Sequence, residues 1–126
     1  MTPVVYDTGA LLAAERRDHA VLTLHARVLE AGQRPLVPVV VLAQAWRGGP
    51  QPNLSRFLKG CRVVADDEWV GRAAGSACAL AKSNDVVDAI VVMTALKREA
   101  LVVSSDKGDL KALASAIGAE LTVFAT

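Results

Sequence analysis

The chain reads PVVYDTG over Pro3–Gly9 and LVVSSDKGDL over Leu101–Leu110. In both stretches a short apolar run, typical of a buried strand, ends near an aspartate, which is Asp7 in the first and Asp106 in the second. Aspartate is also a favoured residue at helix N-termini, and each is followed by residues that favour a helix. Each stretch therefore predicts a strand that leads into a helix, with a carboxylate at the junction.

The rest of the chain continues this alternation of strands and helices. We expect strands over residues 3–6, 36–39, 62–65, 101–104 and 121–124. We expect helices over residues 10–16, 18–32, 40–47, 67–82, 85–99 and 106–116, and a short one capped by Asn53 and closed by Gly60. Such alternation predicts an α/β fold, a three-layer α/β/α sandwich with a central, mostly parallel sheet of four to five strands. With no linker or repeat in view, residues 1–126 are expected to form a single domain.

Composition excludes several classes of protein. The chain is 52% hydrophobic and 21% charged, which favours a packed core over disorder. No apolar run reaches the ~18–20 residues that a membrane-spanning helix needs, and the first residues lack a secretion signal, so we expect a cytoplasmic protein with no membrane partner. Cys61 and Cys78 are isolated and are expected to fill the core rather than bind zinc. Trp46 and Trp69 are expected to pack in the core or at an interface rather than stack on bases.

The near-neutral net charge of +1 conceals an uneven distribution of charge along the sequence. Between Ala31 and Ala65 there is no acidic residue. The basic residues of that segment are Arg34, Arg47, Arg56, Lys59 and Arg62. This pattern is compatible with a surface for a polyanion and equally with an ordinary solvated surface.

Four aspartates are candidates for one shared site. Asp7 and Asp106 follow strands, and sites in open parallel sheets form at the carboxyl ends of the strands. Asp88 lies in the first turn of the helix that precedes the strand ending near Asp106, and Asp109 follows Asp106 by one helical turn. Clustered carboxylates repel one another unless a cation neutralises them, and Mg²⁺ or Mn²⁺ suits oxygen ligands. Such a metal could activate water for hydrolysis of a phosphodiester.

Helix capping is the structural alternative for most of these acids. Asp7, Asp85 and Asp106 all occupy plausible N-cap positions, where a carboxylate is favoured without any chemistry. Asp88 is harder to explain in this way, because it lies inside the apolar stretch Val86–Val92. A charge on a buried helix face requires a partner or a metal.

These motifs together resemble the PIN-domain pattern, and the order of elements resembles its VapC toxin branch over essentially the whole chain. The motifs are the aspartate after the first strand, Asp88 with Ala89 at a helix start, the stretch Ser105–Leu110, and the segment Pro38–Arg47. The resemblance implies an endoribonuclease that depends on Mg²⁺ or Mn²⁺. It also implies that the catalytic, metal-binding acids are Asp7, Asp88 and Asp106.

The resemblance assigns further roles around those three acids. Asp109 becomes an additional metal-binding acid, Thr8 and Asp85 become supporting residues, and Arg47 could position the RNA backbone. Gln44 is a departure, because the family normally has a glutamate at this position. An amide can offer a carbonyl oxygen to a metal but contributes no charge, so the metal affinity should fall.

The resemblance also implies partners: an RNA substrate, a VapB-like antitoxin and a second copy of the chain in a homodimer. Two alternatives stay open. The first is a PIN module that binds RNA or an antitoxin but cuts weakly or not at all, which Gln44 favours. The second is a phosphoacceptor receiver domain, which fits poorly because Asp7 stands alone after the first strand.

Overall fold

A computed structural model describes residues 2–126 of the chain, and within them it contains five strands and seven helices. The strands are β1 (Val4–Tyr6), β2 (Leu36–Pro38), β3 (Arg62–Val64), β4 (Leu101–Ser104) and β5 (Val123–Ala125). The helices are α1 (Thr8–Glu15), α2 (His19–Glu30), α3 (Val39–Ala45), α4 (Pro52–Leu58), α5 (Glu68–Ala81), α6 (Val86–Lys97) and α7 (Lys107–Ala116).

The five strands form one sheet in the order β3-β2-β1-β4-β5, and every neighbouring pair is parallel. The register between β1 and β4 aligns Tyr6 with Val103, so that these two strands end at the same edge of the sheet. The order reverses direction at β1, because β2 lies on one side of it and β4 on the other. This is the kind of position at which open parallel sheets place their sites. The predicted α/β fold with a parallel sheet is therefore confirmed.

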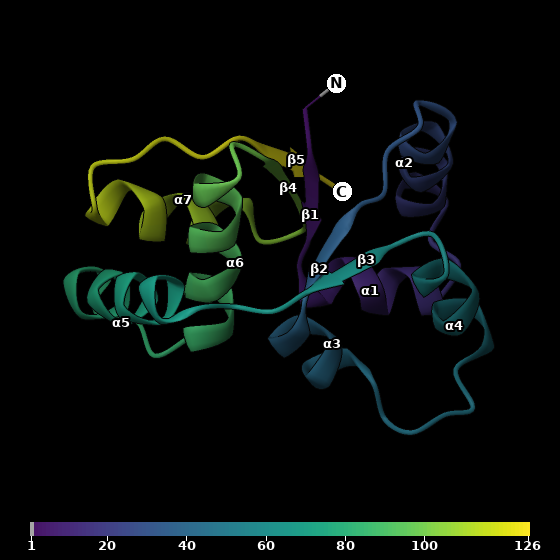
Figure 1. Cartoon of the computed structure of the whole chain (residues 1–126), viewed down its shortest axis with the longest axis horizontal. Helices are drawn as coiled ribbons and strands as arrows, with labels where there is room; N and C mark the ends of the chain where they lie inside the picture. The colour runs from purple at the N-terminus through teal and green to yellow at the C-terminus, as the bar shows by residue number, and fades with distance from the viewer. Residues whose placement is uncertain (1) are drawn as a thin grey trace.

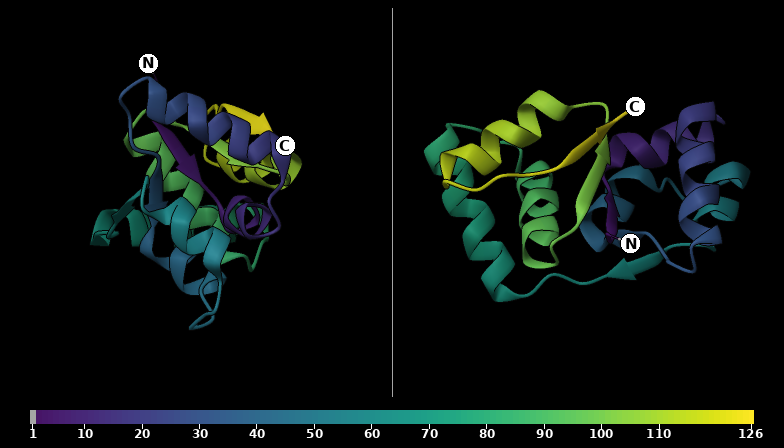
Figure 2. Two further views of the ribbon diagram at one scale, coloured as in Figure 1. Left: turned by 90° about the vertical axis from the view of Figure 1, so that its right-hand side faces the viewer. Right: turned by 90° about the horizontal axis from the view of Figure 1, so that it is seen from above.

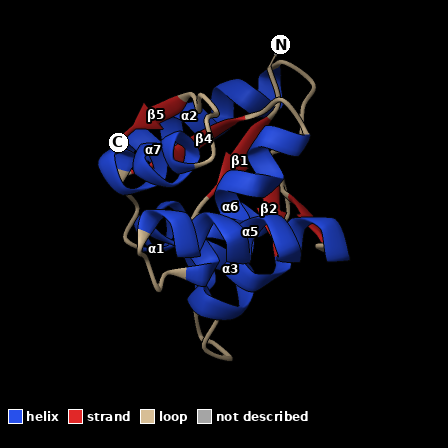
Figure 3. Ribbon diagram, turned by 90° about the vertical axis from the view of Figure 1, so that its left-hand side faces the viewer, coloured by secondary structure: helices blue, strands red, loops and turns tan. Residues whose placement is uncertain are grey.

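Helices cover both faces of the sheet and make it the middle of three layers. Figure 1 shows α5, α6 and α7 on one side of β1 and α1, α2 and α4 on the other. The view from above in Figure 2 shows the same separation, with the strands running between the two groups. In Figure 3 the helices α5 and α6 lie in front of the middle of the sheet, whereas β5 lies at its outer edge.

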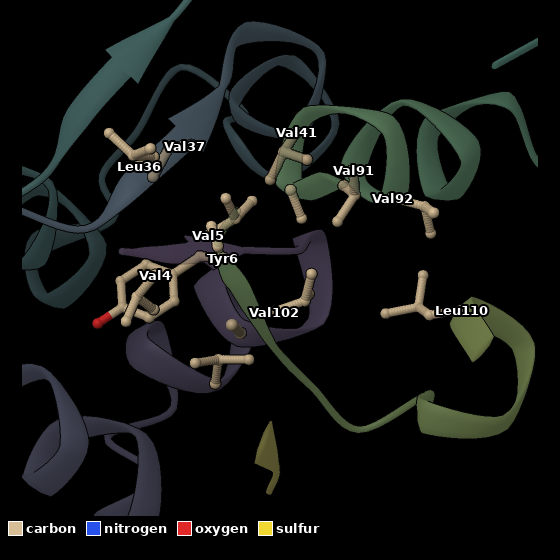
Figure 4. Close-up of a cluster of buried hydrophobic side chains, with 14 of the residues drawn as sticks. Val4, Val5, Tyr6, Leu36, Val37, Val41, Val91, Val92, Val102 and Leu110 are labelled. Atoms are coloured by element: carbon tan, nitrogen blue, oxygen red, sulfur yellow. The ribbon is translucent and has the colours of Figure 1, made fainter. Parts of the chain in front are cut away.

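The core follows the alternation of side chains along β1. Val5 points toward Val41 of α3 and Val91 of α6, whereas Tyr6 extends away from them (Figure 4). On its own side of the sheet, the Tyr6 hydroxyl lies 2.9 Å from Nδ1 of His25, a buried residue of α2. The His25 ring stacks on Phe57 of α4 with 3.8 Å between centroids. The Tyr6 hydroxyl and the His25 ring thus satisfy one another within the core.

Two local expectations were wrong. Asn53 does not cap α4, because the helix begins one residue earlier at Pro52 and the Asn53 amide donates instead to the carbonyl of Glu15, at 3.0 Å. The last strand begins at Val123, where pairing with β4 starts, rather than at residue 121. Of the two places expected for Trp46 and Trp69, the core is excluded, because they are 39% and 55% exposed, and packing at an interface stays a prediction.

The two cysteines are buried free thiols, as expected. Burial raises the pKa of the Cys61 thiol to about 12, which keeps it protonated and unreactive at neutral pH. Among the described residues, no helix combines the length and the apolar character that crossing a membrane requires.

Candidate active site

Asp7 is held at the end of β1 as a buried carboxylate, only 2% exposed. Its Oδ1 accepts a hydrogen bond from the backbone N–H of Ala10 at 2.9 Å, and so caps α1. Burial raises the pKa of Asp7, while hydrogen bonds from Ser104 and Ala10 oppose that rise and the nearby charge of Asp106 adds to it. Asp7 is therefore both a helix cap and a member of an acidic group.

Ser104 connects Asp7 to Asp106 across two neighbouring strands. Its side chain is fully buried at the end of β4, where its hydroxyl bonds the Asp7 carboxylate and its Oγ accepts from the backbone N–H of Asp106 at 2.8 Å. Asp106 stands at the N-cap position of α7 but makes no capping bond with its side chain. Its carboxylate is exposed and remains available to solvent or to a ligand.

Asp85 and Asp88 enter the same edge from the start of α6. Asp85 caps this helix, because its Oδ1 accepts from the backbone N–H of Asp88 at 2.9 Å. The turn before it is fixed by Ser83, whose Oγ accepts from the Asp85 N–H at 3.1 Å, and by Cys78, whose thiol donates to the Asp85 carbonyl. Lys82, the residue before Ser83, caps the end of α5 in the left-handed conformation and so directs the chain into this turn.

Among the acids of this edge, Asp88 has the pKa that is most clearly shifted by its neighbours. Its carboxyl is half-buried, and its pKa is raised to about 7, first by burial and then by Asp85, with further contributions from Asp7 and Asp106. All three neighbours act on Asp88 as like charges. The fold therefore brings together Asp7 at the end of β1, Asp85 and Asp88 at the start of α6, and Asp106 after β4. We call this group of four the acidic edge.

A cleft of about 260 Å³ opens beside Asp88, between the α5–α6 turn and α7. Asp85, Asp88 and Asp109 line it together with Lys82 and Ser83. Asp109 thus reaches the acidic group through this cleft, one helical turn beyond Asp106. Acidic side chains therefore extend from the edge of the sheet along the wall of this cleft.

Thr8 and Gln44 form a contact between α1 and α3. The Thr8 hydroxyl donates to Oε1 of Gln44 at 2.5 Å, which places the Gln44 amide against the residue that follows Asp7. Arg47, by contrast, lies just after α3 and turns back on the end of that helix, where its Nη1 donates to the carbonyls of Ala43 and Trp46 at 3.1 and 2.7 Å. Arg47 therefore has a local structural role, and its contact with RNA stays a prediction.

Within residues 2–126, no basic side chain forms an ion pair with an acid of this edge, although Lys82 lines the cleft beside it. Among residues 2–126, the ion pairs are Arg72 with Glu68 and Lys97 with Asp67, and neither involves the acids of the edge. Nor does that part of the chain contain three or more His, Cys, Asp or Glu side chains already gathered so that they could hold a metal ion. The donor chemistry, which is carboxylate oxygen throughout, fits a hard divalent cation. Closing a ligand set around one would require side chains of the edge to turn.

The sequence identified the acids of this edge but missed Ser104. A serine inside an apolar strand run, two residues before an aspartate, is a weak signal on its own. It becomes informative only once the parallel pairing of β1 with β4 places it beside Asp7. The capping alternative is confirmed for Asp7 and Asp85, whereas the Asp106 side chain does not cap.

Comparisons with known proteins support the fold and go no further. No protein-family model matches the chain, and no curated protein matches its sequence. Among solved structures, the chain is similar to the crystal structure of PAE2754 from Pyrobaculum aerophilum, with a TM-score of 0.65 and 12% sequence identity. The match covers 97% of this chain and 83% of that one. At this identity the likeness concerns the arrangement of helices and strands.

Proposed function

We propose that the chain is a metal-dependent endoribonuclease of the PIN-domain type, similar to VapC toxins, with its active centre at the edge formed by Asp7, Asp88 and Asp106. The observation that carries this proposal is the half-buried Asp88 carboxyl, whose pKa is raised to about 7 first by burial and then by Asp85 on the same helix and by Asp7 and Asp106 from two other segments. An arrangement of mutually repelling acids without a basic partner lowers stability. A function that requires a divalent cation would explain why the fold tolerates it.

Each residue of the edge has a definable task in this mechanism. Bound Mg²⁺ or Mn²⁺ would supply activation of water and neutralisation of phosphate charge. Asp7, fixed by Ala10 and Ser104, would be the most rigid ligand, and Asp88 and Asp106 would complete the set. Asp109 and Asp85 would add negative charge along the cleft and so attract the cation.

The same reasoning extends to the partners. We propose an RNA substrate, a VapB-like antitoxin and a homodimer, on the strength of the sequence resemblance. Exposed apolar side chains on α3 and β3 support a protein contact there, since Val39, Val63 and the adjoining Trp46 are 44%, 43% and 39% exposed. Single exposed apolar residues are common, but three on neighbouring elements favour an interface.

A second function is favoured by two observations. The acids are not pre-assembled into a ligand set within residues 2–126, and the carbonyl oxygen of Gln44 already accepts a bond from Thr8. Both would suit a PIN module that binds RNA or an antitoxin without cutting. An experiment on the purified chain separates the two.

The test is cleavage of a structured RNA pool in Mn²⁺, Mg²⁺ or EDTA, with melting temperatures measured in the same buffers. Under the nuclease proposal, Mn²⁺ raises the melting temperature of the wild type and enables cutting, and Asp88→Asn abolishes both effects. Glu120→Gln, the same loss of charge at an exposed position on the α7–β5 connection, serves as the control and should behave as wild type. RNA binding without cutting or a Mn²⁺ effect would support the silent module instead.

A further inference from the structure

Gln44 is a residue of the candidate site whose side chain is a neutral amide. It lies on α3, which follows β2 directly, and its side chain reaches Thr8 at the start of α1. The hydrogen bond has a direction: the Thr8 hydroxyl donates and Oε1 of Gln44 accepts, at 2.5 Å. Since Asp7 is the residue before Thr8, the amide of Gln44 sits beside the buried carboxylate of the edge.

This direction decides what the amide can still do. Oε1 is the atom of a glutamine side chain that can bind a cation, and one of its two lone pairs already accepts from Thr8. Nε2 carries two N–H donors, and no acceptor within residues 2–126 is bonded to it, while the side chain as a whole is exposed. Gln44 therefore presents two N–H donors to an approaching ligand, against one remaining lone pair of Oε1.

Gln51 shows how a purely structural glutamine looks in the same region. Its Oε1 accepts from the backbone N–H of Arg47 at 2.8 Å, and its Nε2 donates to the carbonyl of Ala45 at 3.0 Å. Both ends of that amide are used inside the protein, where they hold the turn after α3. Only the acceptor end of the Gln44 amide is used in this way.

We propose that Gln44 is a substrate-binding residue that donates a hydrogen bond from Nε2 to a phosphate oxygen of the RNA, with Thr8 as the positioning residue that orients the amide. This inference rests on the proposed nuclease function. Phosphate oxygens are acceptors only, and an edge made of carboxylates repels them. A neutral donor beside the acids binds the phosphate without competing for the cation, which a glutamate at this position could not do.

The experiment measures RNA affinity and cation affinity separately. Binding of a fluorescent single-stranded RNA is measured by anisotropy in EDTA at one fixed salt concentration, because affinity depends on salt. Binding of Mn²⁺ to the RNA-free protein is measured by calorimetry. Gln44→Met removes the amide at an exposed helical position, and Ala43→Met adds the same side chain at the neighbouring exposed position of α3 as the matched control.

Gln44→Met is expected to weaken RNA binding about 10-fold, the typical value of a hydrogen bond to a charged group, and to leave Mn²⁺ affinity within about twofold. Ala43→Met should change neither. Thr8→Val should share most of the loss in RNA affinity, and the double variant Thr8→Val with Gln44→Met should be no weaker than Gln44→Met alone. Thr8→Ser, which keeps the hydroxyl, should bind RNA as the wild type does.

The outcomes that overturn the inference are distinct from those that overturn the proposed function. A wild-type protein that binds and cuts RNA, paired with a Gln44→Met variant of unchanged RNA affinity, removes the role of Gln44 alone. A loss of Mn²⁺ affinity in Gln44→Met with intact RNA binding makes Gln44 a cation ligand instead. A folded wild type that neither binds nor cuts RNA removes the proposed function and this inference with it.

Discussion

Replacing Asp88 by asparagine should stabilise the metal-free protein at alkaline pH. Asparagine has the shape of the protonated acid and lacks the charge that burial disfavours and that Asp85, Asp7 and Asp106 repel. The pKa of Asp88 rises from 3.8 to about 7 in the folded protein. The folded state therefore binds this proton more tightly than the unfolded chain does. The resulting stability is present below the ordinary pKa and is lost as the pH rises toward 7.

The size of the effect follows from that shift. At about 1.36 kcal/mol per pKa unit, the full displacement corresponds to about 4 kcal/mol. Because Asp88 is only half-buried, solvent screening reduces this to about 1–2 kcal/mol. For a chain of 126 residues, the increase in melting temperature should be roughly 3–10 °C at pH 8.

The assay is thermal and urea denaturation in EDTA at pH 4.5 and pH 8, for the wild type, Asp88→Asn and the control Glu120→Gln. The gain of Asp88→Asn should be largest at pH 8 and small at pH 4.5, where the wild-type carboxyl is already protonated. The pKa of His25 is lowered chiefly by burial, so its contribution to the free energy of unfolding falls as the pH falls. This contribution is the same in all three proteins and cancels when they are compared. An Asp88→Asn protein that is no more stable than wild type at pH 8 would refute the electrostatic reasoning about this edge.

Two further predictions concern the residues that support the site and the core. Ser104→Ala removes the hydroxyl that bonds Asp7, so the metal-free protein should lose about 1–3 kcal/mol in urea denaturation, whereas an unchanged midpoint would mean that this hydroxyl is dispensable. A Cβ at Gly60 would lie 3.1 Å from Nε2 of His25, so Gly60→Ala should cost about 1–3 kcal/mol by overpacking. Gly71→Ala is the matched control, because a Cβ there meets open space on α5, and it should stabilise by about 0.5–1 kcal/mol; equal signs for the two glycines would contradict the packing argument.

The features that the sequence predicted are those set by local chemistry and by periodicity. The apolar run Val4–Tyr6 and the cap at Asp7 depend on neighbouring residues only, and both appear in the structure as expected. The same holds for the cap at Asp85. Parallel pairing follows from the alternation of strands with helices, so the convergence of acids from distant segments at one edge could be anticipated as well.

The features that the sequence did not predict depend on contacts between distant segments. Asn53 was expected to cap α4, but the carbonyl of Glu15, 38 positions earlier in the chain, takes its amide. Asp106 was expected to be able to cap α7, but its own backbone N–H bonds Ser104 and its carboxylate makes no capping bond. Tertiary partners decided both cases, and a pattern of residue types does not reveal such partners.

The contrast between local capping bonds and contacts of distant segments also explains why the acids of the edge lie near one another without forming a complete set of metal ligands. Asp7 and Asp85 are each tied to a backbone N–H at 2.9 Å, so their positions are fixed by α1 and α6. The Asp106 carboxylate has no capping bond, and Asp88 is held near Asp85 through a carboxyl that is partly protonated at neutral pH. We infer that a cation would act on these two side chains first, because neither carboxylate caps a helix through a backbone N–H. Two fixed acids and two adjustable ones would let the ligand set form on binding, while the helices that carry the acids stay in place.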